Sequence, residues 1–157
     1  ACMTLQKLKM GALIVFERKT KLKEIVDTGT VVNAEPTAAI IGNIFFNKAP
    51  LHDGAMVMRD GMVYAAGCIL PLTKNDSISI DLGTRHRAAI GMSENSDAVV
   101  VVVSEETGQI SIAVNGILTR NYTKETLINA LETMTLPESS GDKKSGFFSV
   151  RKRGKKE

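Results

Sequence analysis

Residues 98–106 read AVVVVVSEE, and this stretch decides the fold class. Five consecutive β-branched valines predict a strand that is covered on both of its faces. Glu105 and Glu106 begin a turn, and the apolar residues 110–114 form the returning strand of a hairpin. We therefore expect an α/β fold with a central mixed sheet and helices on both faces.

A second hairpin is predicted upstream of the valine run. The pair Asp60-Gly61 separates two apolar stretches, 55–58 and 62–70, and this is a strong hairpin signal. Residues 11–16 form a short apolar run that predicts a buried strand, and residues 31–32 predict a brief one.

Helices are expected between these strands. Amphipathic spacing predicts a short helix over residues 3–10 and a helical turn within 18–30. Further helices are predicted from Glu35-Pro36 through residue 46, over 84–94 with Thr84 or Asp81 as cap, and over 123–135 with Thr123 as cap.

Composition limits the classes of protein that fit. The chain has 157 residues, enough for one domain, and its two cysteines (Cys2 and Cys68) give no disulfide framework and indicate a reducing compartment. The stretch 137–157 has a net charge of +4, which leaves −1 for residues 1–136. The body of the protein therefore gives no argument for nucleic-acid binding, and we expect 137–157 to be a basic disordered tail.

The first motif that could carry chemistry is Leu51-His52-Asp53-Gly54-Ala55. A carboxylate followed by glycine lies where the backbone can come close to a ligand. An ordinary turn explains the same residues, because Asp-Gly pairs are common in turns.

The second motif, Leu82-Gly83-Thr84-Arg85-His86-Arg87-Ala88-Ala89, follows Asp81 at a predicted helix start. Free N–H groups, the helix dipole and arginine together favour an anion such as phosphate. The two arginines lie about 200° apart around a helix, so both cannot face one ligand. A solvated helix start, with Arg87 in a structural ion pair and His86 structural, is the alternative.

The third motif is Ser104-Glu105-Glu106 at the end of the valine strand. Ligands bind at such strand ends in α/β sheets, and a carboxylate there could hold Mg²⁺ or Mn²⁺. A charged hairpin turn is the alternative. The histidines and cysteines have no zinc spacing, and no GxSxG, GxGxxG or Walker motif is present.

These three motifs, in this order, resemble the signature of diadenylate cyclases (the DAC domain) over roughly residues 11–135. The chain is most similar to the membrane-anchored bacterial type, whose transmembrane helices precede the catalytic domain. The resemblance implies the DAC-domain fold and the condensation of two ATP into cyclic di-AMP and two pyrophosphates. It also implies an Mg²⁺- or Mn²⁺-dependent enzyme.

The resemblance further implies roles for residues of these motifs. Asp53 and Arg85 would be catalytic, and Asp53 and Glu105 would hold the metal. ATP and its phosphates would be bound by Gly54, Ala55, Leu70, Gly83, Thr84, Arg85, His86, Arg87 and Ser104. Two protomers would each present one ATP head to head, so that a homodimer is needed for turnover.

The expected layout is a lead segment at 1–10 that marks a truncation, a catalytic domain at 11–136 and the tail at 137–157. The full-length protein is expected on the cytoplasmic face of the cell membrane, the present chain is expected to be soluble, and regulatory protein partners are left open. A non-catalytic module that senses ATP or a dinucleotide is the main alternative, against which Asp53 and Glu105 argue. Nucleic-acid contact through the tail is the third hypothesis.

Overall fold

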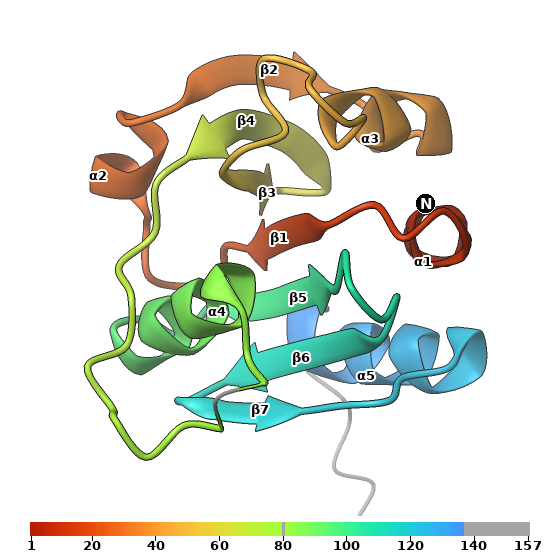
Figure 1. Cartoon of the computed structure of the whole chain (residues 1–157). Helices are drawn as coiled ribbons and strands as arrows, with labels where there is room; N and C mark the ends of the chain where they lie inside the picture. Colours follow the sequence, from red (N-terminus) through yellow and green to blue (C-terminus); the bar gives the residue numbers. More distant parts are fainter. Residues whose placement is uncertain (80, 137–157) are drawn as a thin grey trace, which may run out of the picture.

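The computed structural model describes residues 1–79 and 81–136. In this part of the chain, a mixed sheet of seven strands forms the centre, in the order β2-β4-β3-β1-β5-β6-β7 (Figure 1). The strands are β1 (Ala12–Phe16), β2 (Thr30–Ala34), β3 (Ala55–Arg59), β4 (Met62–Cys68), β5 (Val99–Val103), β6 (Ile110–Val114) and β7 (Ile117–Thr119). β1 is parallel to β3 and antiparallel to β5, so the prediction of a mixed sheet is confirmed.

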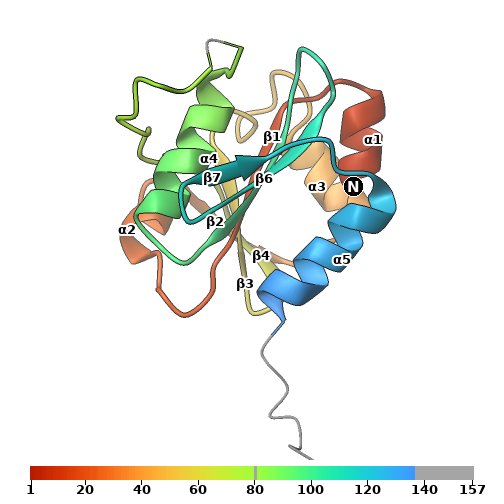
Figure 2. The same cartoon turned by 90° about the horizontal axis from the view of Figure 1, so that it is seen from below.

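Helices cover both faces of the sheet, as predicted. The helices are α1 (Cys2–Lys7), α2 (Lys23–Val26), α3 (Ala38–Ile44), α4 (Thr84–Glu94) and α5 (Lys124–Thr135). Figure 2 shows α1, α3 and α5 on one side of the strands and α2 and α4 on the other. The two sides have separate apolar cores, one containing Leu5, Phe45 and Leu127 and the other Leu22, Ala89 and Met92.

The valine run of β5 joins these two cores. Val99, Val101 and Val103 pack in the core beneath α1, α3 and α5. Val100 and Val102 point the other way, into the core that α2 and α4 cover. All five side chains are buried, because alternate residues of a strand face opposite sides of the sheet. The predicted strand covered on both faces is confirmed.

The start of α3 and the cap of α4 differ from the predictions. α3 begins at Ala38 rather than at Glu35-Pro36, because Thr37 caps it by accepting a hydrogen bond from the Ile40 N–H at 3.2 Å. The cap of α4 is Gly83, not Thr84 or Asp81, and no side chain caps this helix. Thr84 is the first helical residue, one position too late for a cap.

The sequence patterns do not predict β7, whereas they predict the last helix correctly. Asn115 and Gly116 both have positive φ angles, and they form the tight turn between β6 and β7. An Asn-Gly pair is a hairpin signal, but only three residues follow it in the strand. The α5 helix has the predicted cap, in which the Thr123 side chain accepts a hydrogen bond from the Thr126 N–H.

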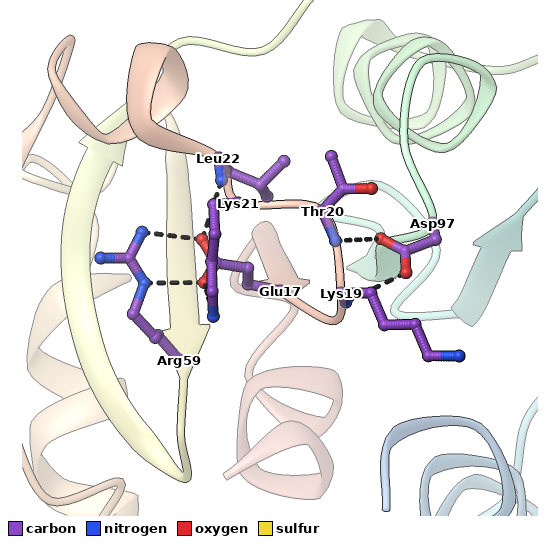
Figure 3. Close-up of polar contacts among 7 residues, drawn as sticks. All are labelled: Glu17, Lys19, Thr20, Lys21, Leu22, Arg59 and Asp97. Atoms are coloured by element: carbon purple, nitrogen blue, oxygen red, sulfur yellow. Dashed lines mark hydrogen bonds and ion pairs between the residues drawn. The ribbon is translucent and has the colours of Figure 1, made fainter. Parts of the chain in front are cut away.

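Two carboxylates hold the loop that follows β1. Glu17 accepts hydrogen bonds from Arg59 at 2.8 and 2.7 Å and from the Leu22 N–H at 2.9 Å. Asp97 accepts hydrogen bonds from the backbone N–H groups of Lys19 and Thr20, at 3.0 Å each (Figure 3). These contacts fix the end of the sheet at which β1 finishes.

The described residues include no helix of the length and apolarity that a bilayer crossing requires. The predicted tail at 137–157 lies outside the described residues.

Candidate active site

A cavity of about 810 Å³ opens at the end of the sheet opposite the Glu17 loop. The register of the strands brings the three motifs there: Ala12 pairs with Val103, and Ala55 pairs with Cys68. One end of the sheet is therefore formed by the starts of β1 and β3 together with the ends of β4 and β5. The lining residues are Leu13, His52, Asp53, Gly54, Gly67, Cys68, Ile69, Leu70, Leu72, Asp81, Gly83, Thr84, Arg85, His86, Ala88, Val103, Ser104, Glu105 and Glu106.

Asp53 and Gly54 enter the cavity from the loop that precedes β3, and the Asp53 side chain is exposed there. Gly54 has a φ of +133°, and a Cβ on it would lie 2.8 Å from the carbonyl carbon of Gly67. The glycine is therefore required by the close approach of β4, and it brings its neighbour Asp53 to the cavity. Ala55, the third residue of this motif, is fully buried in the core and does not line the cavity.

The first turn of α4 forms the second wall. Gly83, Thr84, Arg85 and His86 line the cavity, whereas Arg87 does not. The residues are helical from Thr84, so Arg85 and Arg87 lie about 200° apart around the helix axis, and Arg87, which the resemblance names as a phosphate-binding residue, is absent from the cavity lining. The Arg87 carbonyl accepts a hydrogen bond from the Thr73 N–H at 3.1 Å, which ties the loop after β4 to the helix.

Arg85 and Glu105 form an ion pair across the cavity wall. The Arg85 Nη1 and the Glu105 Oε2 lie 3.0 Å apart, and the side chains are 22% and 58% exposed. Arg85 of the second motif and Glu105 of the third lie twenty residues apart in the sequence, and the ion pair connects the two motifs. The carboxylate of Glu105 is therefore already paired with the guanidinium of Arg85.

Ser104 shapes the turn between β5 and β6. Its hydroxyl accepts hydrogen bonds from the N–H groups of Glu106 at 3.3 Å and of Thr107 at 3.2 Å. The hairpin-turn interpretation of this motif is therefore correct, and the same turn brings Ser104, Glu105 and Glu106 to the cavity.

His86 and Cys68 line the cavity in their neutral forms. Burial lowers the pKa of His86, nearby Arg120 lowers it further, and Glu106 only partly opposes this. Burial raises the pKa of the Cys68 thiol to about 11. At neutral pH the imidazole is therefore uncharged and the thiol is protonated, so neither adds charge to the site.

Carboxylates outnumber cationic side chains in the cavity wall. Among the described residues, the lining includes four acidic residues, Asp53, Asp81, Glu105 and Glu106, and one arginine, Arg85. Among residues 1–79 and 81–136, no three side chains of His, Cys, Asp or Glu are grouped as a metal site requires. Mg²⁺ usually takes one or two protein carboxylates and completes its shell with substrate phosphates. The exposed carboxylate of Asp53 fits such a ligand, whereas Glu105 already pairs with Arg85.

Only part of the apolar lining of this cavity is predicted from the sequence. The sequence points to the stretch around Leu70, and the cavity lining extends beyond it to Gly67 and Leu72; Ile69 and Leu72 are exposed. A glycine inside the apolar run 62–70 was an available signal, because it marks close backbone approach or a bulge. Gly67 has a φ of +67° and lies where the register of β3 and β4 shifts.

Residues 1–118 match a family model described as "DisA bacterial checkpoint controller nucleotide-binding", abbreviated DAC. The chain belongs to the DAC family. Diadenylate cyclase CdaS of Bacillus thuringiensis is 54% identical to this DAC chain over 110 residues, which are 70% of this chain and 55% of the relative. Cyclic di-AMP synthase CdaA of Bacillus subtilis is 46% identical over 126 residues, 80% of this chain and 46% of the relative.

Solved structures agree with the family and the fold. DacA from Staphylococcus aureus, in the form of an N166C/T172C double mutant, superposes on the DAC chain with a TM-score of 0.84 at 40% identity. The match covers 87% of this chain and 91% of that chain. A hypothetical membrane spanning protein from Bacillus cereus matches with a TM-score of 0.75 at 49% identity, over 78% of this chain and 60% of that chain. The DAC chain spans about half the length of the two relatives named above.

Proposed function

We propose that this DAC domain is a diadenylate cyclase that condenses two ATP into cyclic di-AMP and releases two pyrophosphates. The observation that carries this proposal is the meeting of all three motifs around one cavity of nucleotide size. Relatives named diadenylate cyclase or cyclic di-AMP synthase, at 46–54% identity, support the same reaction.

The triphosphate would lie against the first turn of α4. No side chain caps this helix, so the positive end of the helix dipole at Gly83 and Thr84 favours an anion. Arg85 would supply positive charge to the leaving pyrophosphate, and Ser104 would bind phosphate from the turn after β5. His86 is neutral and would act as a hydrogen-bonding group, and Leu70 would contact the adenine.

Asp53 would act at the ribose 3′-hydroxyl. The 3′ oxygen bonds to the α-phosphorus of the second ATP while the bond from that phosphorus to pyrophosphate breaks. The hydroxyl proton leaves toward the Asp53 carboxylate or solvent. Much of the rate enhancement in such transfers comes from holding the attacking 3′ oxygen in line with the bond to the leaving pyrophosphate.

A divalent cation, Mg²⁺ or Mn²⁺, would neutralise charge on the phosphates when bound. Asp53 is the residue of this chain that would hold it, together with phosphate oxygens of ATP. Glu105 would join the metal shell only if its ion pair with Arg85 opens.

Two protomers are required, each presenting one ATP. The 3′-hydroxyl of each ATP attacks the α-phosphorus of the other. A twofold axis between two facing cavities matches the symmetry of the cyclic product. The exposed apolar side chains of Ile69 and Leu72 at the cavity support a contact on this side of the domain. Membrane attachment of the full-length protein is supported by the description of the Bacillus cereus structure as membrane spanning.

Two isosteric variants test the proposal. Asp53→Asn removes the carboxylate from the cavity, and Asp60→Asn makes the same change in the exposed turn between β3 and β4. Asn tolerates the φ of +50° at position 60. We expect the wild-type chain and Asp60→Asn to convert ATP to cyclic di-AMP with Mg²⁺ or Mn²⁺, as measured by mass spectrometry, and Asp53→Asn to lose at least about a hundredfold in rate.

Binding of ATP without conversion by the wild-type chain, at every protein concentration and in a covalently linked dimer, would favour a nucleotide sensor instead. Full activity of Asp53→Asn would show that the role assigned to Asp53 is wrong.

A further inference from the structure

Gly11 lies directly beneath the guanidinium group of Arg85. An ideal Cβ on Gly11 would lie 2.8 Å from both Cζ and Nη1 of Arg85 and 3.1 Å from its Nε. These three atoms are the nearest heavy atoms to that position, and all belong to the same guanidinium. Any side chain at position 11 would therefore occupy the place where Arg85 now lies.

The backbone at Gly11 gives no other reason for glycine. Its φ lies outside the positive range that disfavours other residues. It immediately precedes β1, and the pairing of Ala12 with Val103 puts it beside the end of β5. Glu105, the ion-pair partner of Arg85, follows that strand end by two residues.

The guanidinium is thus confined from two directions. The guanidinium occupies the space that a side chain on Gly11 would fill, and Glu105 holds Nη1 at 3.0 Å. A planar group held in this way keeps one orientation, whereas a free arginine side chain samples many. This confinement fixes where the Arg85 guanidinium lies in the cavity wall that the first turn of α4 forms.

From this we infer that Gly11 is a positioning residue for Arg85, and that the absence of a side chain at position 11 sets where the guanidinium meets the phosphates of the nucleotide. The inference rests on the proposed function for the identity of the ligand. Gly11 does not itself line the cavity, so it acts through Arg85.

The variant Gly11→Ala tests this directly. The added methyl group meets the far end of a flexible side chain rather than backbone, so the fold should tolerate it and Arg85 should move. We expect a melting temperature at or slightly above that of the wild type. We expect kcat for cyclic di-AMP synthesis to fall about tenfold or more, because small misplacements of a reacting group are costly. Gly42→Ala on α3, where a Cβ meets nothing within 4 Å, is the matched control and should keep wild-type activity.

A double-mutant cycle separates positioning from a general structural role. In an Arg85→Lys background, no guanidinium remains for the new methyl group to displace. Adding Gly11→Ala to Arg85→Lys should therefore change kcat by less than about twofold. Equal losses from Gly11→Ala in both backgrounds would show that Gly11 acts on another group, and the inference would be wrong. Wild-type kcat in the single variant Gly11→Ala would also overturn it.

A result that rejects the proposed cyclase activity can be told apart from one that rejects the positioning role of Gly11. If the wild-type chain binds ATP without making cyclic di-AMP, the same cycle is read from ATP affinity by calorimetry. Weaker binding by Gly11→Ala only when Arg85 is present would then support the positioning role, whereas equal weakening in both backgrounds would reject it. If the wild-type chain neither converts nor binds ATP, both proposals are wrong.

Discussion

Replacing Arg59 should destabilise the domain far more than replacing Lys21, although both cations contact the same carboxylate. Glu17 has no exposed side-chain surface, and Arg59 is 20% exposed while Lys21 is 62% exposed. Arg59→Met removes two charge-assisted hydrogen bonds, of 2.8 and 2.7 Å, and the packing of its guanidinium 3.9 Å from the centre of the Tyr64 ring. It also leaves the Glu17 carboxylate buried without its principal partner.

The expected loss in the free energy of unfolding is about 3 kcal/mol for Arg59→Met. A domain of this size should then melt about 10 °C lower. Lys21→Met removes one exposed contact between residues four positions apart, which is worth about 0.5 kcal/mol or less. Because the chain has no tryptophan, urea unfolding is best followed by circular dichroism. Equal losses in the two variants would refute the argument that burial decides the strength of this cluster.

Three further predictions follow from buried polar groups. Burial alone would raise the pKa of Glu17, but hydrogen bonds from Arg59, Leu22 and Lys21 hold it below its ordinary value of 4.5. The stability that this carboxylate contributes is therefore present above pH 4.5 and is lost as the pH falls through the lower pKa of the folded state. In urea unfolding, the free energy of unfolding of Arg59→Met should depend less on pH over that range than that of the wild type. The Ser111 hydroxyl is buried with no hydrogen-bond partner among the described residues, so Ser111→Ala should leave the free energy of unfolding unchanged or raise it, and a loss above about 1 kcal/mol would contradict this. Cys68 should resist alkylation at pH 8 in the folded protein and react when unfolded, because its thiol is buried and its pKa is raised to about 11.

The features that the sequence predicted well depend on local patterns. The valine run of β5 and the hairpin at Asp60-Gly61 need only their neighbours to be interpreted, and both are confirmed. The placement of Arg85 and Arg87 on different sides follows from helix geometry alone, without any tertiary information.

The features that the sequence did not predict depend on residues that are distant in the chain. The ion pair of Arg85 with Glu105 and the contact with Gly11 arise because β1 and β5 lie side by side. The cap of α4 could not be decided locally, since Asp81, Gly83 and Thr84 each suit a helix start and the chain path selects one. β7 has three residues, too few for strand periodicity to show.

In the proposed reaction, two cavities, each with one ATP, must meet before cyclic di-AMP can form. The most direct measurement is the rate of cyclic di-AMP formation from ATP per protomer, followed by mass spectrometry over a wide range of protein concentration. We expect cyclic di-AMP with two pyrophosphates released per molecule, and a rate per protomer that rises with protein concentration until all of the protein is dimeric. A rate per protomer that stays constant into the range where sedimentation shows only monomers would contradict the proposal.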